Sequence, residues 1–222
     1  MHKSDTRKSI IERRKYRKDI NGDAFSLYIS SYPITVDYLK KRIGNKNKIL
    51  VELCCGVGVT LEHIAKGFKH VIGVDIDHNI LTYCRKNLEH AGLSQKTTLI
   101  QGDVTDSRVL KTIKADIVIY DIPFWSPHEF KKQGDLTRKN PSLKSIIDNI
   151  RRVISKDIVV FCSPQFDYEM VKKEIGPCEF QKVFIDGKYD RNHIYLGKLK
   201  RKTGITTLRL KSGIHKKTKD TI

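Results

Sequence analysis

The sequence predicts an α/β domain with a mostly parallel sheet. From Ile49 onward, short apolar runs alternate with longer amphipathic ones, as strands alternate with helices. At 222 residues the chain is long enough for one such domain and too short for two with linkers. No internal repeat or linker interrupts the alternation. Strands separated by helices imply right-handed crossovers, and therefore parallel pairing.

The first half of the domain contains four expected strands. They are K-I-L-V-E-L, H-V-I-G-V-D, T-T-L-I-Q-G-D and A-D-I-V-I-Y-D. Between them we expect a helix over 59–66 after C-C-G-V-G, a helix over 78–91 that stops at Gly92, and a short helix at V-L-K-T-I.

The second half is expected to end in an antiparallel hairpin. A helix in P-S-L-K-S-I-I-D-N-I-R-R-V-I, with Ser142 as its cap, precedes the strand D-I-V-V-F-C and a helix over 167–175. The runs F-Q-K-V-F-I and H-I-Y-L-G-K-L then flank D-G-K-Y-D-R-N. Upstream, P-I-T-V-D-Y-L-K-K-R-I predicts one more helix, capped by Thr35.

The charge is concentrated at the two ends of the chain. The net charge is +18, and residues 1–20 and 200–219 each hold eight Lys or Arg, against three acids and none. We therefore expect a basic extension over 1–34, the folded domain over 35–200 and a basic tail over 201–222. Such ends favour a nucleic acid partner. Neither end has a lipid-inserting apolar face, so a membrane is not expected as a partner.

No apolar run approaches the roughly 18 residues that span a bilayer, and the first residues are charged. These features predict a cytoplasmic protein, or a nuclear one in a eukaryote. The five cysteines include no C-x-x-C pair and no histidine at zinc-finger spacing. Reduced thiols are expected, rather than a disulfide scaffold or a metal site.

The loop after the first strand is typical of ligand binding. Gly56 and Gly58 in V-E-L-C-C-G-V-G-V allow a ligand to approach the backbone and the helix N-terminus. The nicotinamide dinucleotide pattern G-x-G-x-x-G requires a third glycine, where this chain has Leu61. The loop therefore does not predict that dinucleotide.

Three acids are in register with this loop. Glu52 opens the turn, Asp75 ends the next strand in G-V-D-I-D, and Asp103 lies in Q-G-D. Carboxylates at successive strand ends line the crevice of a parallel sheet, although a single such acid is often only a helix cap. One acid can bind ribose hydroxyls, one an adenine amino group, and one can order the loop near an ammonium. This set suits S-adenosylmethionine, which has no phosphates.

The fourth strand ends at Asp121 and continues as D-I-P-F-W. This is a variant of the D/N-P-P-Y/F/W signature of methyltransferases that act on exocyclic amino groups. Asp121 and the carbonyl of Ile122 can accept the N–H groups of a base, and Pro123 favours an extended Ile122. Phe124 or Trp125 can stack on that base, or they pack beneath the adjacent loop.

Over approximately residues 14–199, the chain resembles the trimethylguanosine synthase family of RNA cap guanine-N2 methyltransferases. The similar segments are C-G-V-G, V-I-G-V-D-I-D, Q-G-D, A-D-I-V-I-Y-D-I-P-F-W and D-I-V-V-F-C-S-P. The resemblance implies a seven-stranded Rossmann-like fold of class I methyltransferases, S-adenosylmethionine as donor and guanosine N2 in RNA as acceptor. The implied cofactor-binding residues are Glu52, Cys55, Gly56, Gly58, Asp75 (ribose), Ile76, Asp103 (adenine) and Val104. The implied catalytic residues are Asp121, Ile122, Pro123 and Phe124, with Phe124 and Trp125 on the base.

The family's usual S-P-P-W is D-I-P-F here, and its aromatic-rich N-terminal segment is reduced. Uncapped tRNA or rRNA is therefore as good a substrate as a capped small RNA. Adenine N6 is an alternative target, since D-x-P-F also suits that amino group. A non-catalytic RNA-binding protein is a third possibility, because Cys54 replaces a usual glycine and D-I-P-F is irregular.

Overall fold

The strands of the protein form a single sheet. The computed structural model describes residues 6–14, 16–122 and 142–212. The strands are β1 (Asn45–Leu53), β2 (Phe68–Asp75), β3 (Thr97–Gln101), β4 (Ile117–Asp121), β5 (Ile158–Cys162), β6 (Glu179–Ile185), β7 (Lys188–Tyr195) and β8 (Gly204–Leu210).

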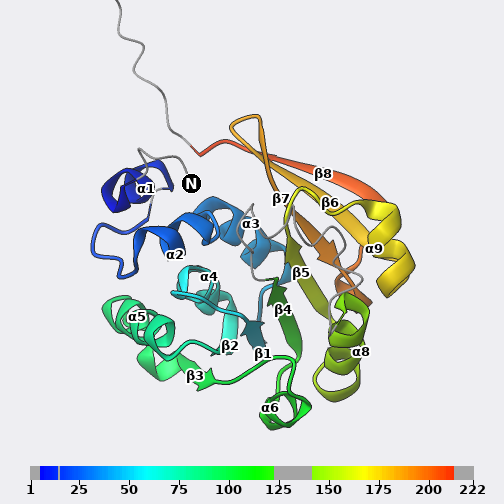
Figure 1. Cartoon of the computed structure of the whole chain (residues 1–222), viewed down its shortest axis with the longest axis horizontal. Helices are drawn as coiled ribbons and strands as arrows, with labels where there is room; N and C mark the ends of the chain where they lie inside the picture. The colour runs from blue at the N-terminus through cyan, green and yellow to red at the C-terminus, as the bar shows by residue number, and fades with distance from the viewer. Residues whose placement is uncertain (1–5, 15, 123–141, 213–222) are drawn as a thin grey trace, which may run out of the picture.

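Helices cover both faces of this sheet (Figure 1). The α-helices are α1 (Arg7–Arg14), α2 (Ala24–Ile29), α3 (Pro33–Ile43), α4 (Val59–Ile64), α5 (His78–His90), α6 (Ser107–Thr112), α8 (Leu143–Val153) and α9 (Tyr168–Ile175). Three short 3-10 helices are η1 (Ala65–Gly67), η2 (Ser94–Lys96) and η4 (Gly197–Leu199). None of the helices in the described ranges is long and apolar enough to cross a membrane.

The strand order is β3-β2-β1-β4-β5-β7-β6-β8. The first five of these pair in parallel, so their carboxyl ends share one edge of the sheet. β7 is antiparallel to both β5 and β6. The α/β fold with a C-terminal antiparallel hairpin is therefore confirmed. The order reverses between β1 and β4, where open α/β sheets hold their ligands.

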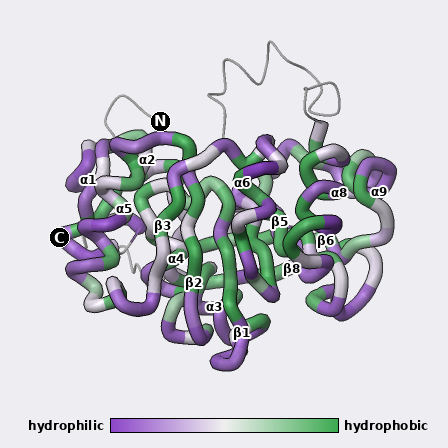
Figure 2. The backbone as a smooth tube through the Cα atoms, turned by 90° about the horizontal axis from the view of Figure 1, so that it is seen from below, coloured by the Kyte–Doolittle hydropathy of each residue, from purple (hydrophilic) through white to green (hydrophobic). Residues whose placement is uncertain are grey.

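The two largest apolar clusters lie on opposite faces of the sheet. β5 shows both, since Ile158, Val160 and Cys162 pack with α6, α8 and α9, whereas Val159 and Phe161 pack with α3, α4 and α5. A strand buried on both faces is a continuous apolar run. β5 is accordingly green in Figure 2.

The sheet has eight strands in the described part of the chain, one more than the seven expected. The additional strand, β8, lies inside the segment expected to be a basic tail from residue 201, and it pairs in parallel with β6. Its residues alternate between half-buried and exposed, as expected of an edge strand. The alternation is short and lies among lysines and arginines, which hid it in the sequence.

The hairpin turns earlier than expected. Asp186 and Gly187 have φ of +49° and +79°, the conformation of a two-residue turn, and β7 begins directly after them. The segment K-Y-D-R-N, expected to be loop, is therefore part of the strand. This change brings Asp190 and Arg191 beside the end of β5.

The described part of the first 34 residues packs against the rest of the domain. Ile10, Ile20 and Leu27 are almost completely buried, together with Val57 and Val59 of the domain. Farther on, α3 begins at Pro33, which suits the first helical position. Thr35 is inside the helix and does not cap it. Ser142 does cap α8, by accepting from the Ser145 amide.

Candidate active site

The loop between β1 and α4 contains three residues with positive φ. They are Cys54 (+63°), Gly56 (+54°) and Gly58 (+85°). A Cβ on Gly58 would lie 2.6 Å from Sγ of Cys84, so packing as well as backbone conformation requires glycine there. Around Gly56 there is open space. Cys54 adopts the conformation that glycine usually supplies, so the loop forms without a glycine at this position.

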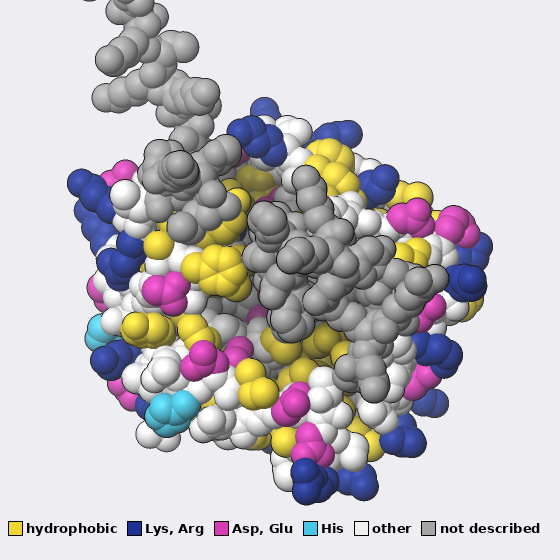
Figure 3. Space-filling view, viewed as in Figure 1, with side chains coloured by type: hydrophobic (Ala, Val, Ile, Leu, Met, Phe, Trp, Pro, Cys, Tyr) yellow, Lys and Arg dark blue, Asp and Glu magenta, His cyan; other side chains and the backbone are white. Residues whose placement is uncertain are grey.

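The loop and the strand ends enclose one cavity of about 890 Å³. Such a volume is typical of a small-molecule or cofactor pocket. Hydrophobic and acidic side chains meet around a hollow on the face seen in Figure 3. The predicted residues that line the cavity are Glu52, Cys55, Gly56, Asp75, Ile76, Asp103, Val104, Asp121 and Ile122. Gly58 is not among the described lining residues; it turns the chain into α4.

Asp75 connects the loop to the end of β2. Its Oδ2 accepts a hydrogen bond from the Gly56 amide at 2.9 Å, and its Oδ1 accepts one from the Asp77 amide at 3.1 Å. Asp77 rather than Asp75 caps α5, by accepting from the amides of Asn79 and Ile80. The carboxylate of Asp75 therefore holds the loop and faces the cavity.

Asp103 follows β3 and also orders its own loop. Its Oδ1 accepts from the amide and the hydroxyl of Thr105, at 2.8 and 2.7 Å. The next residue, Val104, is buried and contributes apolar surface to the same cavity. The end of β3 thus presents a fixed carboxylate beside an apolar wall.

Glu52 is the most deeply buried acid of the site, with 1% of its surface exposed. Its Oε2 has no hydrogen-bond partner among the residues that the structure describes. Burial raises the pKa of Glu52 well above its usual value, and Asp121 raises it further, while a hydrogen bond with Thr60 opposes the shift. An unpartnered, buried carboxyl group at a cavity wall is suited to bind a polar group of a ligand.

Asp121 lies at the end of β4, where the Ile122 amide donates to the Phe161 carbonyl at 3.1 Å. Burial raises the pKa of Asp121 from 3.8 to about 6, and the guanidinium of Arg191 opposes that shift. At neutral pH the carboxylate is therefore mostly ionised. Pro123, Phe124 and Trp125 lie outside the described residues.

The N-terminal segment supplies a wall of the cavity that the sequence pattern did not predict. The described lining residues from this segment are Asp23, Phe25, Ser26, Ile29, Ser30 and Ser31. Asp23 caps α2 by accepting from the Ser26 amide, and Phe25 is exposed. Asp23 and Ser26 in D-A-F-S form the capping pair, and this pattern could have predicted the helix. Nothing local indicated that this helix covers the cavity.

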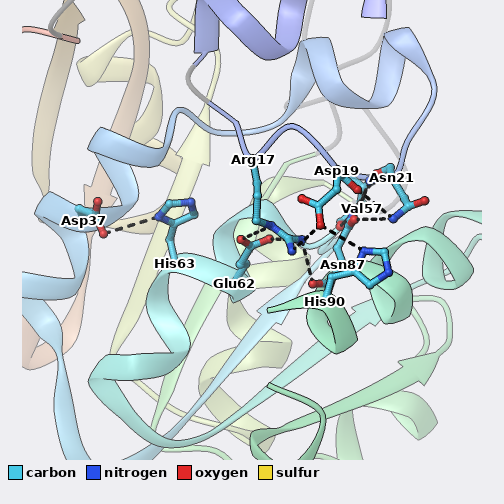
Figure 4. A network of polar contacts seen from close by, with 9 residues as sticks. All are labelled: Arg17, Asp19, Asn21, Asp37, Val57, Glu62, His63, Asn87 and His90. Atoms are coloured by element: carbon cyan, nitrogen blue, oxygen red, sulfur yellow. Dashed lines mark hydrogen bonds and ion pairs between the residues drawn. The ribbon is translucent and has the colours of Figure 1, made fainter. Parts of the chain in front are cut away.

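Polar contacts anchor this segment to α4 and α5 (Figure 4). Nδ2 of Asn87 donates to the carbonyls of Asn21 and Val57, at 2.9 Å each, and its Oδ1 accepts from the Asn21 amide at 2.6 Å. Nε of Arg17 lies 3.1 Å from Oε1 of Glu62. One buried asparagine therefore joins the N-terminal segment to the glycine loop.

The acidic lining of the cavity contrasts with the basic chain. Its acids are Asp23, Glu52, Asp75, Asp77, Asp103 and Asp121, and the described lining residues include no Lys or Arg. A phosphate-bearing ligand would be repelled there, whereas a ligand with positive charge would be attracted. All five cysteines are free thiols, and the described residues contain no cluster suited to a metal ion.

Comparison with known proteins identifies a family. The family model for RNA cap guanine-N2 methyltransferases matches residues 47–174, more than half of the chain. The rRNA N(6)-adenosine-methyltransferase metl-5 of Caenorhabditis elegans is 30% identical over 92 residues, which cover 40% of this chain and 43% of that protein. The U6 snRNA (guanine-N(2))-methyltransferase THUMPD2 of Bos taurus is 32% identical over 101 residues, which cover 45% and 20%. The chain thus spans less than half the length of these two relatives.

Solved structures share the fold at low identity. A protein from Porphyromonas gingivalis W83, provisionally described as a methyltransferase, has a TM-score of 0.65 at 16% identity, over 82% of this chain and 44% of that one. A methyltransferase from Geobacter sulfurreducens has a TM-score of 0.52 at 13% identity, over 85% of each chain.

Proposed function

Because the chain belongs to the RNA cap guanine-N2 methyltransferase family, we propose that it methylates the exocyclic N2 amino group of a guanosine in RNA. The observation that carries this proposal is the carboxylate of Asp121, which lies in the same cavity as the glycine loop. The match to a U6 snRNA guanine-N2 methyltransferase supports the choice of base.

The methyl donor of this family is S-adenosylmethionine, and the cavity has the groups to hold it. This cofactor supplies an electrophilic methyl group on a positively charged sulfur. We assign ribose binding to Asp75, adenine binding to Asp103 with Ile76 and Val104, and the ammonium end to Glu52 beside Cys55 and Gly56. The acidic lining and the unpartnered Oε2 of Glu52 fit a cationic ligand.

The proposed role of Asp121 is to accept hydrogen bonds from the target amino group. The lone pair of that nitrogen is delocalised into the ring, so the nitrogen is a poor nucleophile. Acceptors that hold its N–H groups favour a geometry in which the lone pair points at the methyl group. We assign the second acceptor to the carbonyl of Ile122, and base stacking to Phe124 or Trp125 after the rigid Pro123.

Two other functions have specific support. Adenine N6 presents a similar amino group, and the similarity to an rRNA adenosine N6-methyltransferase favours it as the second candidate. An RNA-binding protein without activity has two supports, Cys54 in the glycine loop and the irregular D-I-P-F. The first is weak, because Cys54 adopts the left-handed conformation that the loop needs.

The test is methylation of RNA by the purified protein, followed by digestion to nucleosides and mass spectrometry. We expect N2-methylguanosine from wild type and none from Asp121→Ala, with S-adenosylmethionine still bound by calorimetry. N6-methyladenosine alone would refute the guanine proposal. If the wild type does not bind S-adenosylmethionine at millimolar cofactor concentration, the non-catalytic RNA-binding protein is favoured. Total RNA from cells lacking and regaining the gene would identify the substrate among tRNA, rRNA and capped small RNA.

A further inference from the structure

A buried arginine on the antiparallel strand faces the catalytic end of β4. The side chain of Arg191, in β7, is 3% exposed, and its Nη1 lies 3.8 Å from Oδ2 of Asp121. Seventy residues separate the two in sequence. They meet because β7 runs antiparallel beside β5, with Asn192 opposite Cys162 at the end of that strand.

The guanidinium of Arg191 is held from several sides. Its Nη1 donates to Oγ of Ser31 at 2.8 Å, and its Nε donates to Oδ2 of Asp190 at 3.0 Å. Its Cζ lies 5.7 Å from the centre of the Phe161 ring. Ser31 is itself buried in the cavity wall, where its carbonyl accepts from the hydroxyl of Tyr16 at 3.2 Å. The N-terminal segment therefore orients the arginine that faces Asp121.

The charged and titratable groups around Asp121 come from three strands. Glu52 and Cys54 belong to β1 and its loop, Cys162 to β5, and Asp190 and Arg191 to β7. Burial raises the pKa of Asp121, Asp190 raises it further, and Arg191 is the group that lowers it. Burial also raises the pKa values of Glu52, Cys54 and Cys162, so the two thiols are protonated near pH 7.

We propose that Arg191 is a positioning residue for methyl transfer, which keeps the carboxylate of Asp121 ionised and aimed into the cavity. This role rests on the proposed function. A neutral carboxylic acid would offer the target amine one proton donor and fewer acceptor sites, whereas the carboxylate offers acceptors alone. Arg191 thus makes a buried aspartate usable as the acceptor at the end of β4.

The buried ion pair of Arg42 and Glu179 shows how the pair of Arg191 and Asp121 differs from a purely structural ion pair. Arg42 and Glu179 lie 2.7 Å apart with side chains only 4% and 3% exposed, away from the cavity, and Arg42 stacks 3.6 Å from the Tyr195 ring centre. The Asp121 side chain stays 17% exposed at the longer distance. Its carboxylate is therefore influenced by Arg191 and still available to a ligand.

The test compares the pH dependence of kcat in Arg191→Met and Arg191→Lys. An opposite charge within about 4–6 Å lowers a carboxyl pKa by about 1–3 units. We expect the acidic limb of the pH profile of kcat in Arg191→Met to move up by about one pH unit or more, which lowers kcat at pH 6.5 by about threefold or more. Arg191→Lys should keep the limb within a few tenths of a unit. The Kd for S-adenosylmethionine should stay within about threefold in both variants, since Arg191 is not among the described lining residues.

Arg42→Met is the matched control, because it removes a second buried arginine from an ion pair outside the cavity. It should lower Tm and leave the acidic limb unchanged. Ser31→Ala keeps the charge of Arg191 and removes its anchor, so we expect kcat to fall several-fold with little movement of the limb. In Asp121→Asn, residual activity should no longer respond to Arg191→Met.

The outcomes separate this role from the proposed function. An active wild type whose limb does not move in Arg191→Met overturns the role of Arg191 alone. If Arg191→Met does not fold, a kcat in Ser31→Ala equal to that of wild type overturns it. A wild type that binds the cofactor and methylates no RNA overturns both. Formation of N6-methyladenosine overturns only the choice of base, and the pH comparison then applies to that product.

Discussion

The backbone amide of Gly56 donates to Oδ2 of Asp75 at 2.9 Å, which connects the first loop of the sheet to the end of the second strand. Because Oδ1 of the same carboxylate accepts from the Asp77 amide, one acid orders the two chain segments on either side of the cavity. Ligand binding at Asp75 and the shape of the glycine loop are therefore coupled.

We predict that Asp75→Asn weakens S-adenosylmethionine binding. The amide replaces one acceptor oxygen by a donor, so it cannot serve Gly56, Asp77 and a ribose hydroxyl together. Hydrogen bonds to a charged group contribute about 1.5–3 kcal/mol, which corresponds to a Kd increase of about 10- to 150-fold by calorimetry. Asp116→Asn is the control, since Oδ2 of Asp116 accepts from the Ile49 amide at the start of the parallel strands. Equal affinity losses in both variants would contradict the prediction.

Gly58→Ala should destabilise the fold more than the same change at another glycine with positive φ. At Gly58 a Cβ would meet Sγ of Cys84 at 2.6 Å, whereas nothing lies within 4 Å of a Cβ at Gly92, whose φ is +68°. The left-handed conformation alone costs about 1–2 kcal/mol, and overpacking adds about 1–3 kcal/mol. Urea unfolding measures both changes. Equal losses of unfolding free energy would show that Cys84 moves aside without cost.

The sequence predicted those parts of the site that depend on local pattern. Gly56, Asp75, Asp103 and Asp121 follow apolar runs, and parallel pairing brings the ends of such runs to one edge. Leu27 and Val57, 30 residues apart, belong to one buried cluster, and no periodicity in either segment indicates that packing. Arg191 was hidden for a similar reason: its place beside Asp121 depends on the two-residue turn at Asp186 and Gly187, and K-Y-D-R-N reads as a polar loop.

Asn87→Ala should detach the N-terminal segment from the glycine loop. The change leaves the partly buried Asn21 amide and the buried Val57 carbonyl without these bonds. Each unsatisfied buried group costs about 1–3 kcal/mol, so we expect an unfolding free energy lower by about 2 kcal/mol or more. Hydrogen exchange in residues 16–31 should become faster, and cofactor affinity should fall.

The control for Asn87 is His90→Ala, one turn farther along α5. His90 is exposed, and its Nδ1 lies 3.6 Å from Oδ2 of Asp19. Such an exposed contact contributes little to the free energy of unfolding. In His90→Ala we expect hydrogen exchange in residues 16–31 to be as slow as in wild type. If Asn87→Ala leaves exchange and affinity unchanged as well, the asparagine does not anchor the segment.

Asp121→Asn should stabilise the protein at high pH while it removes most of the methyl transfer activity. The folded-state pKa of about 6 exceeds the ordinary 3.8, so ionisation of Asp121 opposes folding. This penalty is absent below about pH 4 and complete above about pH 7; at 1.36 kcal/mol per unit it is at most about 3 kcal/mol. The variant's gain in unfolding free energy should therefore grow from pH 4 to pH 7. A gain independent of pH would contradict the raised pKa.

A deletion that tests whether the basic C-terminal end binds RNA must leave β8 intact. Removing residues 203–222 would also remove β8 and uncover the edge of β6, so any loss of RNA binding could come from unfolding. Removing only 213–222 deletes Lys216, Lys217 and Lys219 together with Asp220. We expect weaker RNA binding and a slope of log K against log salt that is flatter by about 1–2, since each phosphate contact to single-stranded RNA contributes about 0.7. Cofactor affinity should not change.

Replacing the three lysines by glutamine in the full-length chain should reproduce the weaker RNA binding and the flatter salt slope. An unchanged slope in both proteins would mean that these lysines do not contact RNA.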